Sequence, residues 1–129
     1  AAQVGAKVCL INKYSASDGD LFPWGFRALG LGKLIGTRTW GGIVGISGSL
    51  PYMDGTDIRV PFFTSFDPKT GSWIIENHGV DPDILIDNDP VKEWNGEDQQ
   101  LDRAIQEVMK ELQNRKPLPG VPTPRDFSK

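Results

Sequence analysis

The alternation of apolar and polar positions predicts an α/β chain that opens with a strand, a helix and a second strand. An apolar run over residues 7–12 is typical of a buried strand. Apolar positions at helical spacing up to residue 29, with Gly30 as a stop, predict a helix that begins near residues 18–20 and has Pro23 in its first turn. A second strand is predicted over 32–39, and strand–helix–strand units of this length normally connect parallel strands.

The middle of the chain is predicted to be richer in loops. Glycines over 40–48 are too irregularly spaced for a dinucleotide fingerprint and lack the lysine of a phosphate loop, so we expect a loop in which the backbone closely approaches another element or a ligand. Residues 50–66 are predicted to form a hairpin around an Asp-Gly pair at 54–55. Short strands are predicted over 72–76 and 84–86.

The end of the chain divides into a helix and a proline-rich tail. Residues 98–114 have helical periodicity, and Asn95 or Asp98 can cap the helix. Four prolines in residues 116–129 exclude a helix there and predict an extended tail. The apolar stripe expected to pack on the core consists of Leu101, Ala104, Ile105, Val108 and Leu112.

Length and charge narrow the class of protein. A chain of 129 residues fits one domain, which we place at residues 1–115 with the tail at 116–129. The net charge of −3 without a dense basic cluster argues against a nucleic-acid partner, and no apolar run is long enough to span a membrane. The single cysteine, Cys9, lies in the first strand and is expected to be a small buried hydrophobe.

The first residues suggest that the chain is part of a longer protein. It does not begin with Met, and it enters its first strand almost at once. We therefore expect an upstream half of the same protein, and any targeting segment would lie there. A cytoplasmic location and a periplasmic or secreted location both agree with this sequence.

Ser17 occupies a promising position for a nucleophile. It lies in a tight turn, rich in Ser, Ala and Gly, between the first strand and the first helix. Such a turn lifts a hydroxyl clear of the sheet, and the first amides of the helix can face a developing negative charge. The G-x-S-x-G motif of hydrolases is absent, and Ser15 or Ser17 could instead simply cap the helix.

His78 is the only histidine and follows Glu76 by two positions. A Ser17–Glu76–His78 triad is therefore conceivable, although the sequence alone does not bring His78 to Ser17, and a loop histidine without a role is the default.

Four aspartates close together in the sequence suggest a metal site. They lack the spacing and the closing glutamate of a calcium loop, so a solvated loop is the better interpretation. The four are Asp81, Asp83, Asp87 and Asp89.

Three ordered blocks of sequence resemble the catalytic core of the tricorn protease family, which belongs with the carboxyl-terminal processing peptidases. They are SASDGD at 15–20, LGLGKLIGTRTWGG at 29–42 and IENHGVDPD at 75–83. The resemblance extends over about residues 7–112. It implies a crotonase-like (ClpP-like) α/β core, of which residues 1–115 would be the C-terminal part, incomplete in this chain.

The resemblance also implies roles for individual residues. Ser17 matches the nucleophile, the backbone N–H of Asp18 matches one half of the oxyanion hole, and Glu76 matches the acid that orients the catalytic histidine through an intervening serine. That histidine, the serine, the glycine with the other oxyanion amide and the acid that selects basic P1 residues all lie upstream in the family and are not in this chain. His78 does not match the catalytic histidine.

The family contains a second mechanism, in which a lysine is the base. Its motif is T-F-G-K-G, and the corresponding run here is Thr-Trp-Gly-Gly-Ile at 39–43, with Gly42 in the place of the lysine. Lys13 and Lys33 do not match the motif. Gly41 and Gly42 are expected to line the substrate cleft, with a purely structural role as the alternative.

The implied function is that of a tricorn-type serine endopeptidase acting on peptides or proteins. The fragment alone is expected to be inactive, to need its upstream half and to form a homo-oligomer; no cofactor is implied. The alternatives are a non-catalytic scaffold that keeps the peptidase fold, or a Ser/Lys processing peptidase.

Overall fold

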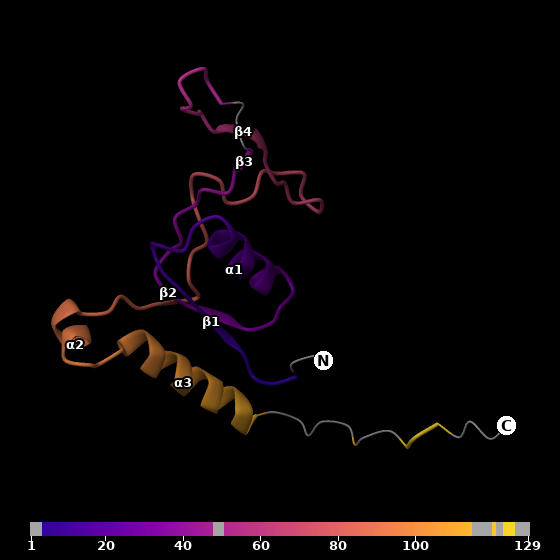
Figure 1. Cartoon of the computed structure of the whole chain (residues 1–129). Helices are drawn as coiled ribbons and strands as arrows, with labels where there is room; N and C mark the ends of the chain where they lie inside the picture. Colours follow the sequence, from indigo (N-terminus) through magenta and orange to yellow (C-terminus); the bar gives the residue numbers. More distant parts are fainter. Residues whose placement is uncertain (1–3, 48–50, 115–119, 121–122, 126–129) are drawn as a thin grey trace.

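A three-stranded parallel sheet forms the centre of the chain (Figure 1). It consists of β1 (Val8–Ile11), β2 (Lys33–Gly36) and β5 (Ile84–Leu85), in the order β1-β2-β5. The helices α1 (Asp18–Ala28) and α3 (Gln99–Gln113) both contact β1 and β2, and they lie on opposite sides of these strands. The computed structural model describes residues 4–47, 51–114, 120 and 123–125.

The predicted strand–helix–strand unit is confirmed. β1 and β2 pair in parallel from Val8 opposite Lys33 to Ile11 opposite Gly36, with α1 as the crossover. The turn that follows α1 places Gly30 at φ 63°, a conformation that glycine adopts without steric cost. Pro23 is a correction: α1 begins at Asp18, so Pro23 lies in its second turn rather than its first.

The core lies mainly between the sheet and α1. Leu34 and Ile35 on the central strand are both fully buried, because successive side chains of a strand point to opposite faces and both faces of β2 are covered. Ile11 and Phe26 pack with Leu34 on the α1 side, and Cys9 packs against this cluster. Cys9, predicted to be a small buried hydrophobe, is only partly buried, and this burial raises the pKa of its thiol.

α3 agrees with the predicted helix over 98–114, and its N-cap Asp98 accepts a hydrogen bond from the Leu101 amide. The predicted apolar stripe is only partly buried: Ala104 is 5 % exposed, whereas Ile105 is 52 % exposed. The reason is that β1 is the outer strand of the described sheet, so part of the stripe extends past its edge. The side chains of Val8, Leu10, Leu101, Ile105, Val108 and Met109 line the resulting apolar groove.

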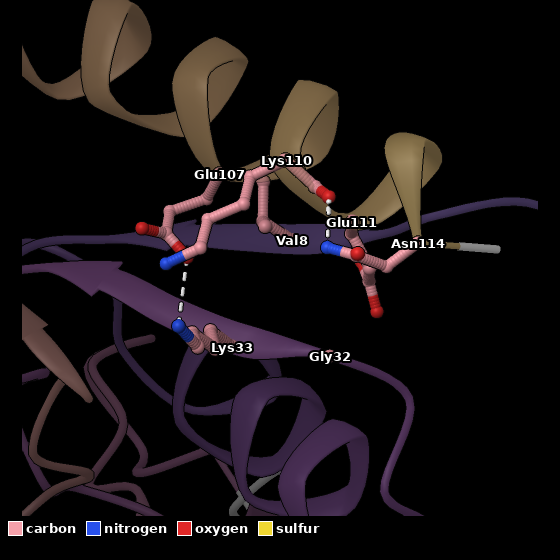
Figure 2. A pocket seen from close by; sticks show the side chains of 7 residues that line it. All are labelled: Val8, Gly32, Lys33, Glu107, Lys110, Glu111 and Asn114. Carbon is pink, nitrogen blue, oxygen red and sulfur yellow. Dashed lines mark hydrogen bonds and ion pairs between the residues drawn. The ribbon is translucent and has the colours of Figure 1, made fainter.

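A buried acid ties α3 to the sheet. Glu107 is 9 % exposed and accepts a hydrogen bond of 2.7 Å from the Nζ of Lys33 on β2 (Figure 2). Arg103, one turn earlier on α3, is its second cationic partner. The hydrogen bond from Lys33 lowers the pKa of the Glu107 carboxyl.

The hairpin begins earlier than predicted. β3 (Gly45–Ser47) and β4 (Val60–Phe63) form an antiparallel pair that projects away from the parallel sheet (Figure 1), so the first strand falls in the region predicted as a loop. A Cβ atom at Gly45 would lie 1.9 Å from the Phe63 ring, so the missing side chain makes room for the opposite strand. The predicted turn is confirmed, because the amide of Gly55 donates to the Tyr52 carbonyl.

The predicted strand over 72–76 is wrong. It is reduced to one bridge, between Phe66 and Trp73, and the chain then turns through Ile75 and Asn77 at φ 28° and 61°. The predicted strand over 84–86 is confirmed as β5.

One helix was not predicted. α2 (Pro90–Trp94) begins after Asp89, whose carboxylate accepts from the amides of Val91 and Lys92. None of the helices in the described part of the chain has the length and apolar character needed to cross a membrane. Most of the predicted tail, 116–129, lies outside the described residues.

Candidate active site

Ser17 lies at the junction of the β1 loop and α1, as the N-cap of the helix. Its backbone has φ 56° and ψ −111°, a conformation that a residue with a side chain rarely adopts. The hydroxyl makes no capping hydrogen bond, and the side chain is exposed. Ser17 therefore occupies the N-cap position, but its side chain does not cap the helix as the alternative predicted. Ser15 does not cap it either, because its hydroxyl accepts from the amide of Asn12.

Asp18, the first residue of α1, leaves its backbone N–H available. The Ser17 carbonyl accepts from the amides of Asp20 and Leu21, whereas the described residues provide no acceptor for the Asp18 amide. The first amides of a helix lack partners within the helix and attract negative charge. Within the described part of the chain, neither the Ser17 hydroxyl nor the neighbouring Asp18 amide has a hydrogen-bond partner.

A loop of residues 39–44, called the glycine loop below, lies against this turn. The amide of Trp40 donates to the carbonyl of Ser15 at 2.9 Å, which ties the loop to the segment before Ser17. The amide of Thr39 donates to the carbonyl of Val80, which ties the start of the loop to the chain before β5. The loop follows β2 and Ser17 follows β1, so both lie beyond the carboxyl ends of parallel strands, where α/β proteins place their sites.

Asp20 holds the centre of the glycine loop. Its carboxylate is fully buried, and its two oxygens accept from the amides of Gly41 at 2.8 Å and Gly42 at 3.2 Å. Asp20 was not among the residues predicted from the sequence to belong to the site. The available signal was the spacing Ser17-x-x-Asp20, which fits a capping box, in which the serine and the acid each bond a backbone amide of the other.

Glu76 holds the end of the glycine loop. One carboxylate oxygen, Oε2, accepts from the amides of Ile43 at 2.7 Å and Val44 at 3.0 Å. The other oxygen, Oε1, has no hydrogen bond to any described residue. The neighbouring residue Asn77 donates its amide to the Gly41 carbonyl, so the turn that contains Glu76 is fixed directly to the loop.

His78 is directed elsewhere. Its Nε2 lies 2.8 Å from Asp81 Oδ2, and Arg38 Nε lies 3.6 Å from the other oxygen of that carboxylate. In the part of the chain that the structure describes, His78 has no hydrogen bond to Ser17 or Glu76. The structure brings Glu76 and the turn that carries Ser17 to one loop but, among the described residues, does not assemble the Ser17–Glu76–His78 triad.

The two glycines of the loop differ in what requires them. Gly41 has φ 87°, and a Cβ atom there would lie 2.4 Å from the Gly79 amide nitrogen, so its conformation and its backbone neighbours both favour glycine. A Cβ atom at Gly42 would lie 2.2 Å from the ring of Trp40, a side chain that is 67 % exposed and has room to move. Close packing therefore accounts for Gly41 and leaves Gly42 without a strict structural requirement.

Three of the four aspartates considered as a metal cluster bind other groups of the protein. Asp83 accepts from the Leu34 amide at 2.7 Å and pairs with Arg27 at 3.0 Å. Asp81 binds His78, and Asp89 caps α2. Across the described residues, no three His, Cys, Asp or Glu side chains are grouped so that they could hold a metal ion.

Comparison with known proteins supports the resemblance. The model of peptidase family S41 matches residues 3–86. The chain is 46 % identical over 110 residues to the tricorn protease of Thermoplasma acidophilum, covering 85 % of this chain, and 43 % identical over 101 residues to tricorn protease homolog 1 of Streptomyces coelicolor, covering 78 %. A crystal structure of the tricorn protease matches with a TM-score of 0.76 and 46 % identity over 83 % of this chain and 10 % of that one.

The chain spans 10 % and 9 % of the length of these two relatives. Its α/β architecture with a parallel sheet matches the solved tricorn structure. The match to the family model extends over β1, α1, β2, the glycine loop and Glu76, and thus over all the residues of the candidate site. The chain therefore belongs to peptidase family S41, where the proteins it matches are tricorn proteases and their homologues.

Proposed function

We propose that this chain carries the nucleophile of a tricorn-type serine endopeptidase and that the general base comes from a segment outside it. The observation that carries the proposal is the end of α1, where Ser17 has a strained backbone and an exposed hydroxyl without a capping bond, next to the available amide of Asp18. Strain of this kind persists where the surroundings enforce it, and it is common at active sites.

In the proposed reaction, Ser17 Oγ attacks the carbonyl carbon of the scissile peptide bond, and the external histidine accepts its proton. The Asp18 amide donates to the resulting oxyanion, together with a second amide from outside this chain. The C–N bond then breaks, the histidine returns the proton to the leaving amine, and water hydrolyses the acyl-enzyme. Glu76 would orient the histidine through an intervening serine, and its Oε1 is available for that bond because only Oε2 binds the glycine loop.

In this proposal, the upstream segment of the protein completes the catalytic domain. Residues 1–115 would be the C-terminal part of a catalytic domain with a crotonase-like core, followed by the proline-rich residues 116–129. The outer edge of β1 and the apolar groove beside α3 are where upstream strands and side chains would complete that core. Self-association into a homo-oligomer would cover further apolar surface.

A lysine base at position 42 is absent from the sequence, where Gly42 stands in its place. A Ser/His mechanism therefore fits this chain better than a Ser/Lys mechanism.

A fluorophosphonate probe tests the proposal on the complete enzyme, meaning this chain together with the upstream segment. Covalent labelling should occur at Ser17, identified by peptide mass spectrometry, and a Ser17→Ala variant should not be labelled. A folded complete enzyme that neither labels nor hydrolyses peptides would support the non-catalytic scaffold instead.

A further inference from the structure

We infer that Asp20 is a positioning residue for the proposed reaction: its buried carboxylate fixes the glycine loop to the first turn of α1 and so sets the placement of Ser17 relative to Glu76. The inference rests on the proposed function, because it assigns Asp20 a task in the same site. Asp20 touches neither substrate nor reacting atoms in this scheme and acts through the loop.

The contacts of Asp20 are those of a fixed anchor. A fully buried carboxylate is unfavourable unless hydrogen bonds compensate it, and here the amides of Gly41 and Gly42 each donate to one of its oxygens. Its place as the third residue of α1 adds the favourable field of the helix N-terminus. The side chain is thus held in one orientation, and the two amides with it.

The same contacts keep Ser17 free. In a capping box over Ser17 and Asp20, the serine hydroxyl would bond the Asp20 amide and the acid would bond back to the Ser17 amide. In the structure the Asp20 carboxylate binds the glycine loop instead, and the Ser17 hydroxyl makes no capping bond. Neither side chain therefore caps the helix: that of Asp20 holds the glycine loop, and that of Ser17 is exposed as the proposed nucleophile.

The loop transmits the position of Asp20 to Glu76. Four successive amides are divided between the two carboxylates, Gly41 and Gly42 on Asp20 and the next two on Glu76. The four amides belong to consecutive residues, and the Asn77 amide beside Glu76 donates to the Gly41 carbonyl, so a displacement at Gly41 also moves the donors that locate Glu76. Displacements on the order of 1 Å in a catalytic arrangement can cost ~100-fold in rate.

The test compares Asp20→Asn with Asp102→Asn in the complete enzyme. Asparagine keeps the shape but places an NH₂ group against one of the two amides. Asp102 is an exposed acid in the first turn of α3 and controls for the charge change near a helix N-terminus. We expect D20N to lower kcat roughly 10- to 100-fold with little change in KM, and to slow fluorophosphonate labelling of Ser17 similarly, while D102N stays at wild-type values.

A second readout is independent of activity. In the 129-residue chain, the amides of Gly41 and Gly42 should be protected from hydrogen exchange, and D20N should expose them while circular dichroism stays unchanged. Unprotected amides in the wild type, or a folded D20N with wild-type kcat and labelling, would overturn the inference. A wild-type enzyme that is not labelled at Ser17 would instead refute the proposed function. Hydrogen exchange would then still test the contact between Asp20 and the two loop amides.

If D20N does not fold, the Asp20→Glu variant tests whether Asp20 is a positioning residue. Its charge and both acceptor oxygens remain, but the added methylene must displace the two loop amides. We expect faster exchange of those amides together with a lower kcat. Faster exchange with unchanged kcat would show that Asp20 has only a structural role.

Discussion

The carboxylates of Asp20 and Glu76 bind successive pairs of backbone amides in one loop. Asp20 binds those of Gly41 and Gly42, and a single oxygen of Glu76 binds the next two along the chain. The first acid belongs to the helix that begins directly after Ser17, and the second to a turn that precedes β5. The glycine loop therefore connects the proposed nucleophile to the acid of the proposed catalytic set.

Replacing Ser17 should separate stability from activity. Ser17→Ala and Ser17→Gly should both reduce peptide hydrolysis by the complete enzyme by several orders of magnitude, because each removes the nucleophile. Glycine accepts φ 56° without strain, so S17G should be more stable than S17A by about 1 kcal/mol in urea unfolding. Hydrolysis at the wild-type rate by either variant would refute the nucleophile, and equal stabilities would refute the strain.

Gly41 should tolerate a side chain far less well than a glycine with similar φ elsewhere. Gly41→Ala combines positive φ with a contact of 2.4 Å to the Gly79 amide nitrogen, and should destabilise the fold by more than about 2 kcal/mol. Gly55→Ala is the matched control, since Gly55 has φ 82° with nothing within 4 Å of the added Cβ, and should cost only about 1 kcal/mol. Chemical denaturation of both variants gives the difference, and equal losses would show that the loop moves away freely.

Glu76→Gln distinguishes the two oxygens of this side chain. A glutamine can still offer one oxygen to the two loop amides, but its NH₂ group cannot accept a bond from the serine proposed to link it to the histidine. In the complete enzyme we expect kcat to fall at least about 10-fold with KM nearly unchanged. Wild-type kcat in E76Q would mean that Glu76 serves only to hold the loop.

Stability should fall in acid through Glu107. The pKa of this carboxyl is lower in the folded chain than in the unfolded one, chiefly because of the hydrogen bond from Lys33. Its contribution is therefore complete above the unfolded value, about 4.3, and is lost as the pH falls through the folded value. Urea unfolding at several pH values between roughly 6 and 3 should show a smaller loss in Glu107→Gln than in the wild type.

The control for that series is Glu111→Gln, an exposed glutamate on the same helix. Its pH dependence should match that of the wild type. An acid response of Glu107→Gln that is as steep as that of the wild type would place the loss of stability on other carboxylates.

The isolated chain should not hydrolyse peptides. A serine hydroxyl is a weak nucleophile without an adjacent base, and His78 is bonded to Asp81 rather than to Ser17. Fluorogenic peptides incubated with residues 1–129, with and without the upstream segment, provide the measurement. Turnover by the chain alone that His78→Ala abolishes would restore the local triad.

Elements specified by contiguous residues were predictable. β1, α1 and β2 follow from apolar periodicity and a glycine stop, and the start of α3 follows from Asp98, whose own side chain caps it. Elements that depend on distant partners were not. β3 is defined by its antiparallel pairing with β4, in which Gly45 lies opposite Phe63, whereas the apolar residues near Ile75 turn away instead of continuing a strand.

The candidate site divides in the same way. The position of Ser17 at the end of a strand-to-helix turn was predictable from the sequence, because neighbouring residues specify both the turn and the start of the helix. The groups that Asp20 and Glu76 bind follow from the fold, because their partners are backbone amides. Nearly every residue carries such an amide, so no side chain marks it in advance, and the fold alone brings these four amides to two carboxylates.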